Sequence, residues 1–263
     1  MNPILTAVLV LVGLGALSSI LLVVANKLMF VPSDEKADEI TALLPGANCG
    51  ACGFAGCSDY ASAVAAGKAK PNLCVPGGLA TAKKVAAAMG EEPGKLVEMT
   101  AVVACHGNYD NTKDKYNYAG IQSCAATEML HAGRAECPYG CVGYGDCVSV
   151  CKFDAISVHN GVAQVDLAKC TGCGACAAKC PKQIIKLIPK NSHSVVLCSN
   201  HDGGAATRKV CVAGCLACRK CEKVCPTGAI AVENNCAKID FSKCIHCGAC
   251  MRTCPVHAPE VQL

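Results

Sequence analysis

The longest apolar stretch of the chain lies at its amino terminus, where Ile4 to Ala25 contains no charged residue. At about 1.5 Å per residue, a helix of this length can cross a bilayer. No Lys or Arg precedes it, and it exceeds the apolar core of a cleavable signal peptide. Lys27 and Lys36 follow, and positive charge on that flank favours a cytoplasmic carboxy-terminal side. Residues 1–30 are therefore predicted to be a single-pass anchor in the inner (cytoplasmic) membrane, with everything that binds clusters on the cytoplasmic side.

Shorter periodic segments follow the anchor. Residues 36–44 predict a helix that ends before Pro45, and residues 58–68 predict an alanine-rich helix. A third helix is expected over residues 78–89, before a turn rich in Gly and Pro. An apolar strand then ends at Cys105.

The remainder of the chain is repetitive. The segments from Cys151 to Cys170 and from Cys225 to Cys244 have the same length and share an Ala-Ile-x-Val strand, a turn, and an Asp three residues before Lys-Cys. We interpret each segment as the hairpin between the two cysteine runs of a two-cluster ferredoxin. Internal repeats of this kind are quasi-linear, so clusters in successive repeats would form a linear path for electron transfer.

Three cysteine runs have the spacing C-x2-C-x2-C-x3-C followed by proline, ending at Cys180, Cys225 and Cys254. In bacterial ferredoxins the first three thiolates of such a run hold one [4Fe–4S] cube, and the fourth holds the neighbouring cube. Zinc usually takes two ligands from each of two distant knuckles, which is a different spacing. Disulfide scaffolds are short secreted chains, whereas this chain has 263 residues and an odd count of 25 cysteines. The runs favour electron transfer.

The crossover rule predicts four cubes in two tandem modules, and three of the ligand sets are regular. These sets are Cys151, Cys170, Cys173 and Cys176; Cys215, Cys218, Cys221 and Cys254; and Cys225, Cys244, Cys247 and Cys250. In the fourth set Tyr144 stands where a ligand is expected, and Lys152 stands where the regular runs have proline. We expect Cys137 to replace the missing ligand. The fourth predicted set is Cys137, Cys141, Cys147 and Cys180.

A further motif precedes the modules, with the spacing C-x2-C-x4-C-x16-C. Its members are Cys49, Cys52, Cys57 and Cys74. Glycines between the first three bring backbone N–H groups close to sulfur, and such hydrogen bonds tune cluster potential. Zinc remains an alternative at this motif. A fifth [4Fe–4S] centre is favoured.

Five cysteines stand outside these sets: Cys105, Cys124, Cys198, Cys211 and Cys236. Cys236 lies in a hairpin turn and is interpreted as a plain thiol. Cys105 and Cys198 each end an apolar strand, in the strings Val-Val-Ala-Cys and Val-Val-Leu-Cys, and each is followed by a polar loop and another cysteine. Cys105, Cys124, Cys198 and Cys211 are therefore either buried thiols, the ligands of a sixth cluster, or redox disulfides.

The amino-acid composition and the absence of certain motifs limit the classes of function that the chain can have. With four Phe, six Tyr and no Trp, aromatic residues cannot dominate a core, so clusters and their thiolates would fill the interior. The formal charge of +4 would become roughly −6 with five cubes at about −2 each. No basic stripe interleaved with aromatics indicates nucleic-acid binding. No G-x-G-x-x-G after a strand and no P-loop is found, so neither NAD nor flavin is expected on this chain, and it has no substrate-converting active site of its own.

The predicted fold class is α+β: one N-terminal transmembrane helix, a small helical 4Fe–4S domain, and two tandem bacterial-type two-cluster ferredoxin modules. The expected boundaries are 1–30 for the anchor, 31–95 for the 4Fe–4S domain, 96–136 for a linking segment with Cys105 and Cys124, and 137–190 and 191–263 for the modules.

The anchor, the segment LLPGANCGACGFAGC with Cys74 downstream, and the ferredoxin modules together resemble the B subunit of the Rnf complex, in the longer form found in clostridium-like bacteria. The four-cysteine domain is also similar to one in corrinoid iron–sulfur proteins, which lack the anchor and the tandem modules. The resemblance implies an electron-transfer subunit of an ion-translocating ferredoxin:NAD+ oxidoreductase. Its implied partners are soluble ferredoxin, the other membrane subunits and the lipid bilayer, with NAD and flavin on sister subunits.

Two other functions are compatible with the cysteine pattern. One is a membrane-tethered polyferredoxin that serves a hydrogenase or a formate enzyme. The other is an iron–sulfur redox sensor, which is disfavoured because sensors usually need an output domain and the chain has no effector module.

Overall fold

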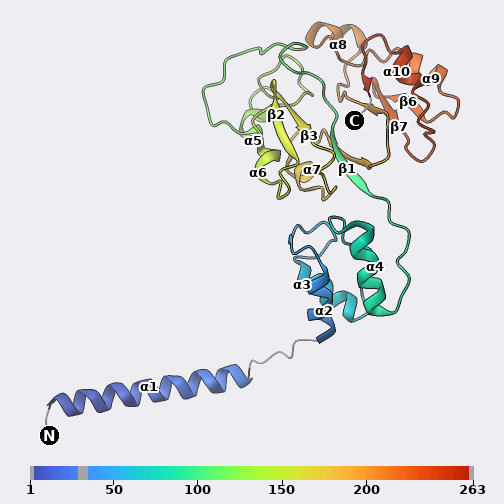
Figure 1. Ribbon diagram of the computed structural model, residues 1–263. Helices are drawn as coiled ribbons and strands as arrows, with labels where there is room; N and C mark the ends of the chain where they lie inside the picture. Colours follow the sequence, from blue (N-terminus) through green and yellow to red (C-terminus); the bar gives the residue numbers. More distant parts are fainter. Residues whose placement is uncertain (1–2, 29–34, 261–263) are drawn as a thin grey trace.

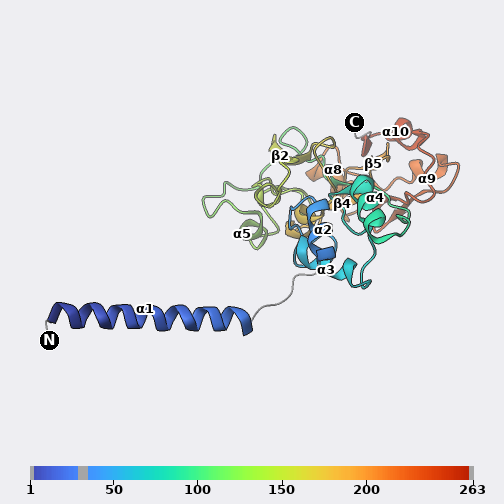
Figure 2. The same ribbon diagram turned by 60° about the horizontal axis from the view of Figure 1, so that its bottom comes forward.

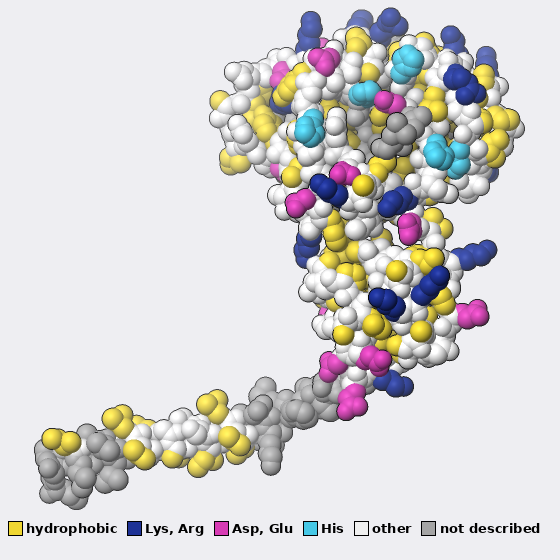
Figure 3. Space-filling model, viewed as in Figure 1, with side chains coloured by type: hydrophobic (Ala, Val, Ile, Leu, Met, Phe, Trp, Pro, Cys, Tyr) yellow, Lys and Arg dark blue, Asp and Glu magenta, His cyan; other side chains and the backbone are white. Residues whose placement is uncertain are grey.

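The computed structural model describes residues 3–28 and 35–260 (Figure 1), and within the first helix it describes the side chains of Ile4 and residues 11–24. That helix, α1, spans Pro3–Leu28. Its described apolar side chains are exposed and appear as the yellow groups along α1 in Figure 3. The predicted transmembrane span coincides with α1. In the part of the chain that the structure describes, however, no helix is both long enough and apolar enough to cross a membrane.

A small helical domain follows, as predicted. It contains α2 (Glu35–Leu43), α3 (Cys57–Ala65) and α4 (Gly78–Met89), with α2 packed against the other two helices (Figure 2). The buried Tyr60 is central to its core. Its hydroxyl donates to the carbonyl oxygen of Lys70 at 2.8 Å and accepts from the N–H of Leu73 at 3.2 Å. These bonds fix the return loop that leads to Cys74.

The first ferredoxin module is built from two antiparallel strand pairs. Strand β1 (Met99–Val103) pairs with β4 (Ile185–Pro189), and β2 (Ile156–His159) pairs with β3 (Val162–Val165) as the predicted hairpin. The short helices are α5 (Cys124–Glu128), α6 (Asp146–Ser149) and α7 (Ala175–Lys179). The sequence placed 96–136 in a linking segment, but β1 is an integral strand of this module. The reason is its long-range pairing with β4, which buries Ala101 and Val103 in the module core.

The second module repeats the arrangement. Strand β5 (Val195–Val196) pairs with β8 (Pro259–Glu260), and β6 (Ile230–Glu233) pairs with β7 (Cys236–Ile239). Its helices are α8 (Gly204–Val210), α9 (Lys220–Val224) and α10 (Ala249–Thr253). Both predicted hairpins are thus present. Their paired positions correspond, since Ile156 faces Val165 and Ile230 faces Ile239.

The two modules pack against each other. Val102, Ile188 and Val195 form a shared apolar cluster between them. The hydroxyl of Ser199 in the second module donates to the carbonyl oxygen of Ala104 in the first, at 2.9 Å. Because Ala104 and Ser199 each adjoin a strand-end cysteine, this packing brings Cys105 and Cys198 to the same interface.

Candidate iron–sulfur sites

In two of the regular sets, the four cysteines that the crossover pattern predicts line one cavity together. Site 4 is defined as Cys151, Cys170, Cys173 and Cys176, which line one small cavity with apolar neighbours. Site 6 is defined as Cys225, Cys244, Cys247 and Cys250, which line a similar cavity in the second module. In site 4, burial and repulsion from the other three thiols raise the pKa of Cys176 to about 11.

Two further quartets are identified by the effect of their cysteine thiols on the pKa of one member of the set. Site 5 is defined as Cys215, Cys218, Cys221 and Cys254: burial and the three other thiols of the set raise the pKa of Cys221 to about 11. Site 1 is defined as Cys49, Cys52, Cys57 and Cys74: burial, followed by repulsion from the other three, raises the pKa of Cys74. A thiolate quartet of this kind is stable only when a cation compensates it, and cluster iron would do so.

Backbone N–H groups point at the sulfurs of these sites. Ala155 donates to Cys151 at 3.4 Å, and Ala229 donates to the corresponding Cys225 at 3.2 Å. The residue before each donor adopts positive φ, Asp154 at +47° and Gly228 at +62°, which turns the following N–H back toward the sulfur. Hydrogen bonds to cluster thiolates stabilise the more reduced state, so the backbone itself tunes these sites.

The irregular quartet differs from the sequence-based assignment. Site 3 is defined as Cys124, Cys141, Cys147 and Cys180, which line one cavity. Burial, with repulsion from Cys141, Cys124 and Cys180, raises the pKa of Cys147 to about 12. Cys137 was expected here and is not among the residues that line the cavity. The fourth cysteine of this cavity is instead Cys124, which comes from the segment that precedes the cysteine run.

Asp146 holds Cys124 in position. Its carboxylate accepts hydrogen bonds from the N–H groups of Cys124 and Ala125, at 3.0 and 3.1 Å, and from the Ser123 hydroxyl at 2.9 Å. It thus caps α5 from another part of the chain, in place of a local side-chain cap. Burial alone would raise the pKa of Asp146, but these hydrogen bonds outweigh it and lower the pKa. Because Asp146 precedes Cys147, the cap links two members of site 3.

Cys137 lies instead in a sixth quartet between the modules. Site 2 is defined as Cys105, Cys137, Cys198 and Cys211, which line a single cavity that Cys141 of site 3 also borders. Burial, together with repulsion from Cys141 of site 3 and from Cys137, raises the pKa of Cys105 to about 12. The sixth set expected from the sequence contained Cys124 in place of Cys137, so the two isolated cysteines have exchanged sites. No redox disulfide is present among the described cysteines, since all of them are free thiols.

Site 2 is pseudo-symmetric. Each module contributes the cysteine at the end of its first strand and the first cysteine of a C-x3-C pair: CPYGC begins at Cys137, and CVAGC begins at Cys211. The N–H of Cys141 donates to the sulfur of Cys105 at 3.3 Å, and the N–H of Cys215 donates to Cys198 at the same distance. The repeated C-x3-C spacing was the sequence signal that could have paired these residues correctly.

Cys236 is the cysteine outside all six quartets, and it is not a simple turn thiol. It is 3% exposed, and its S–H donates to the carbonyl oxygen of Cys198 at 3.2 Å. Hydrogen bonding by Cys236 lowers the pKa of Cys198 to about 7 and the pKa of Cys215 to about 6. Cys236 therefore lies between site 2 and site 5 and touches a member of each.

The donor sets fit polynuclear iron–sulfur clusters. Each is a thiol quartet, and the best-defined ones surround a small cavity with apolar walls and inward N–H donors, which is the environment that such clusters use. Over residues 3–28 and 35–260, no three His, Cys, Asp or Glu side chains are grouped in a way that could hold a single metal ion. When bound, a [4Fe–4S] cluster supplies reversible one-electron transfer.

Family profiles support the same class. The FeS profile, an Fe–S cluster domain, matches residues 44–76; a 4Fe–4S dicluster domain matches 169–229; and a 4Fe–4S binding domain matches 237–260. Together with the mixed helix and strand modules described above, these matches define a multi-domain iron–sulfur protein of the ferredoxin type.

Similar proteins place the chain within this class. The B subunit of the Na+-translocating ferredoxin:NAD+ oxidoreductase complex of Acetobacterium woodii is 41% identical over 92% of this chain and 73% of its own length. The B subunit of the ion-translocating oxidoreductase complex of Methanosarcina acetivorans is 40% identical over 92% of each chain. The B subunit of the proton-translocating ferredoxin:NAD+ oxidoreductase complex of Clostridium ljungdahlii is 38% identical over 92% of this chain and 86% of its own. The chain belongs to the family of B subunits of Rnf-type ion-translocating oxidoreductase complexes, as an electron-transfer subunit.

Proposed function

We propose that this chain relays electrons from soluble reduced ferredoxin to the membrane subunits of an Rnf-type complex through six [4Fe–4S] clusters, one in each of sites 1 to 6. The observation that carries the proposal is the assembly of the cysteines into six quartets, with Cys236 as the one left over. The relatives named as ferredoxin:NAD+ oxidoreductase subunits support the direction from ferredoxin.

Contacts between neighbouring segments connect the sites in one order: 6, 5, 2, 3, 4, 1. Within each module, neighbouring sites share a cysteine run. Between the modules, the N–H groups of Cys215 in site 5 and Cys141 in site 3 donate to the two site 2 sulfurs of Cys198 and Cys105. Beyond site 4, Lys152 bonds to the backbone that leads to Cys49 of site 1. Site 2 would therefore connect the clusters of the two ferredoxin modules into one continuous electron-transfer path.

The second module is the proposed place where electrons arrive. Cys218 of site 5 and Cys247 of site 6 are exposed, which supports direct access by a soluble protein. Site 1 belongs to the domain next to the amino-terminal helix in sequence, which supports delivery toward membrane subunits from there.

Membrane attachment through the amino terminus is part of the proposal. The uncharged sequence of residues 4–25 supports it, as does the exposure of the described apolar side chains of α1, between 49% and 72%. The positive flank at Lys27 supports a cytoplasmic location for the cluster domains. Removal of residues 1–26 should release the protein from membranes with its iron intact, and iron-loaded protein that partitions to membranes equally with and without this segment would contradict attachment.

Iron analysis tests the cluster proposal. Anaerobically purified protein should hold roughly 24 iron atoms and as many acid-labile sulfides, from six cubes of four. Cys124→Ser and Cys137→Ser should each remove or convert one cluster, and different ones, whereas Cys236→Ala should leave iron unchanged. A content of about 20 iron atoms, unaffected by Cys105→Ser, would remove site 2 from the proposal. Zinc in place of iron would refute the whole relay.

A further inference from the structure

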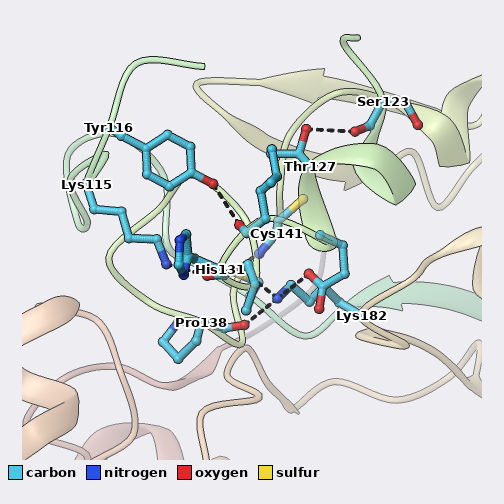
Figure 4. Close-up of polar contacts among 12 residues, drawn as sticks. Lys115, Tyr116, Ser123, Thr127, His131, Pro138, Cys141 and Lys182 are labelled. Atoms are coloured by element: carbon cyan, nitrogen blue, oxygen red, sulfur yellow. Dashed lines mark hydrogen bonds and ion pairs between the residues drawn. The ribbon is translucent and has the colours of Figure 1, made fainter. Parts of the chain in front are cut away.

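The first module contains a buried cation beside site 3. The side chain of Lys182 is 7% exposed and forms an ion pair with Glu128. Its Nζ also donates to the carbonyl oxygens of Ala132, at 2.8 Å, and Pro138. Figure 4 shows Lys182 reaching from the turn that precedes β4 toward the loop that these acceptors belong to.

The repeat makes this lysine unusual. Lys182 is two residues after Cys180, the site 3 member that comes from a regular run. In the second module the corresponding cysteine is Cys254, and the residue two positions later is Val256, which packs into the apolar core. A charged side chain thus stands at site 3 where the otherwise equivalent site 5 has an aliphatic one.

The loop that Lys182 contacts contains a tight turn at residues 130–132, and three side chains donate hydrogen bonds to it. Tyr116 and Lys115 donate to the carbonyl oxygens of Leu130 and His131, at 2.8 and 2.6 Å, and the buried lysine takes the next carbonyl, that of Ala132 (Figure 4). His131 and Ala132 have φ of 49° and 58°, a conformation that non-glycine residues adopt at a cost. The three hydrogen bonds donated by Lys115, Tyr116 and Lys182 stabilise the turn and so offset the conformational cost of these positive φ values.

The gripped segment supplies one cysteine to each of two sites. Cys124 begins it and belongs to site 3, and Cys137 ends it and belongs to site 2. Because Lys182 contacts Glu128 and Ala132 within this segment and Pro138 directly after it, it fixes the two cysteines relative to each other.

The charges of the pair bear directly on site 3. Lys182 lines the site 3 cavity. One-electron reduction would take a four-thiolate cube from about −2 to about −3, so a nearby cation favours the reduced state and a nearby carboxylate disfavours it. The Oε2 atom of Glu128 is buried, and apart from its ion pair with Lys182 it has no hydrogen-bond partner among the described residues, so Lys182 compensates its charge.

We propose that the Lys182–Glu128 pair sets the reduction potential of the site 3 centre. In this pair Lys182 is a positioning residue for the loop that carries Cys124 and Cys137, and Glu128 limits how far the cation raises the potential. This inference rests on the proposed function only in that site 3 must hold a cluster.

Two neutralising variants of the full-length holoprotein test the pair. Glu128→Gln keeps an acceptor for Lys182 and leaves the cation uncompensated, so the midpoint potential of the site 3 centre should shift to a more positive value. Lys182→Met leaves the carboxylate uncompensated, so the potential should shift to a more negative value. Lys186→Met, an exposed lysine on β4, is the matched control and should leave the potential unchanged. The centre is identified as the electron paramagnetic resonance signal that Cys124→Ser removes.

Opposite signs in the two variants support an electrostatic role, because a purely structural role gives no reversal. Shifts of the same sign, or no shift in Glu128→Gln, would overturn the inference. If Lys182→Met loses site 3 iron, the sign of the shift in Glu128→Gln still decides. If Cys124→Ser removes no signal from the wild-type spectrum, it is the cluster assignment of site 3 that has failed.

Discussion

The Nζ of Lys152 lies 2.6 Å from the carbonyl oxygen of Ala47, and it also donates to the carbonyl of Asn48 at 3.2 Å. Lys152 follows Cys151 of site 4, and Asn48 precedes Cys49 of site 1. The residue that departs from the proline of the regular runs is therefore the residue that joins the first ferredoxin module to the small helical domain. A proline could not supply these hydrogen bonds.

Lys152→Ala should slow electron transfer from site 4 to site 1 without loss of iron. Hydrogen bonds from a charged donor at an exposed position contribute about 1 kcal/mol, so their loss would lower the docked population relative to the undocked one about fivefold. The measurement is rapid-mixing reduction, followed through the site 1 signal that Cys57→Ser removes. Lys169→Ala is the control, because Lys169 is exposed beside Cys170 of the same site 4 and its ion pair with Asp166 is 3.7 Å long. Equal rates in both variants would contradict a role for this junction.

Cys236→Ala should shift the potentials of sites 2 and 5 to more negative values while iron content stays the same. The reason is that the buried Cys236, whose S–H donates to the carbonyl oxygen of Cys198, lowers the pKa of the Cys198 and Cys215 thiols and so favours the negatively charged state of both sites. Potentiometry with spectroscopic detection measures the shifts. Cys236→Ser keeps a donor and should shift the potentials less. A loss of four iron atoms in the alanine variant would show instead that Cys236 is a ligand.

The regular sites could be predicted from the sequence because their ligands are set by local spacing. A loop with cysteines three residues apart wraps one corner of a cube wherever it lies, and the fourth ligand follows from the hairpin. Cys124 carries no such spacing, and Cys137 carries only the C-x3-C spacing that it shares with Cys211. Their assignment depends on long-range contacts, namely the Asp146 cap on α5 and the grip of Lys182 on the following turn. The strand β1 illustrates the same limit, since its apolar pattern was evident but its partner β4 was not.

The apoprotein should lose stability as pH rises above about 9, and reconstitution with iron should abolish this dependence. In the fold without iron, burial and mutual repulsion hold the pKa of Cys105 and Cys147 at about 12, above their ordinary value of 9.0. Groups with a raised folded pKa contribute stability that is fully present below pH 9 and is lost as pH rises toward 12. Cys198 and Cys215 have lowered values and the opposite sign, so their contribution is lost as pH falls through about 7 and about 6.

Denaturant unfolding of the anaerobic apoprotein at pH 7.5 and pH 10 measures this dependence. The midpoint should be lower at pH 10. Iron uptake should also release protons, because thiols must ionise to bind metal. A midpoint that is the same or higher at pH 10 would mean that the buried thiols do not dominate the pH response of the apo fold.

Ile245→Glu should impair reduction by ferredoxin but not by a small chemical reductant. Ile245 follows Cys244, lines the site 6 cavity and is 60% exposed, so it offers an apolar contact next to a centre whose Cys247 is also exposed. A carboxylate there would have to be desolvated at the interface and would add negative charge beside the cluster. If Ile245 is a central contact, the loss should reach about tenfold in kcat/KM for ferredoxin, equivalent to about 1.4 kcal/mol. Ile121→Glu is the control, since Ile121 is 76% exposed and lies outside the second module. Equal slowing by both substitutions would indicate that ferredoxin docks elsewhere, and the proposed order of the sites would then have to be reversed or branched.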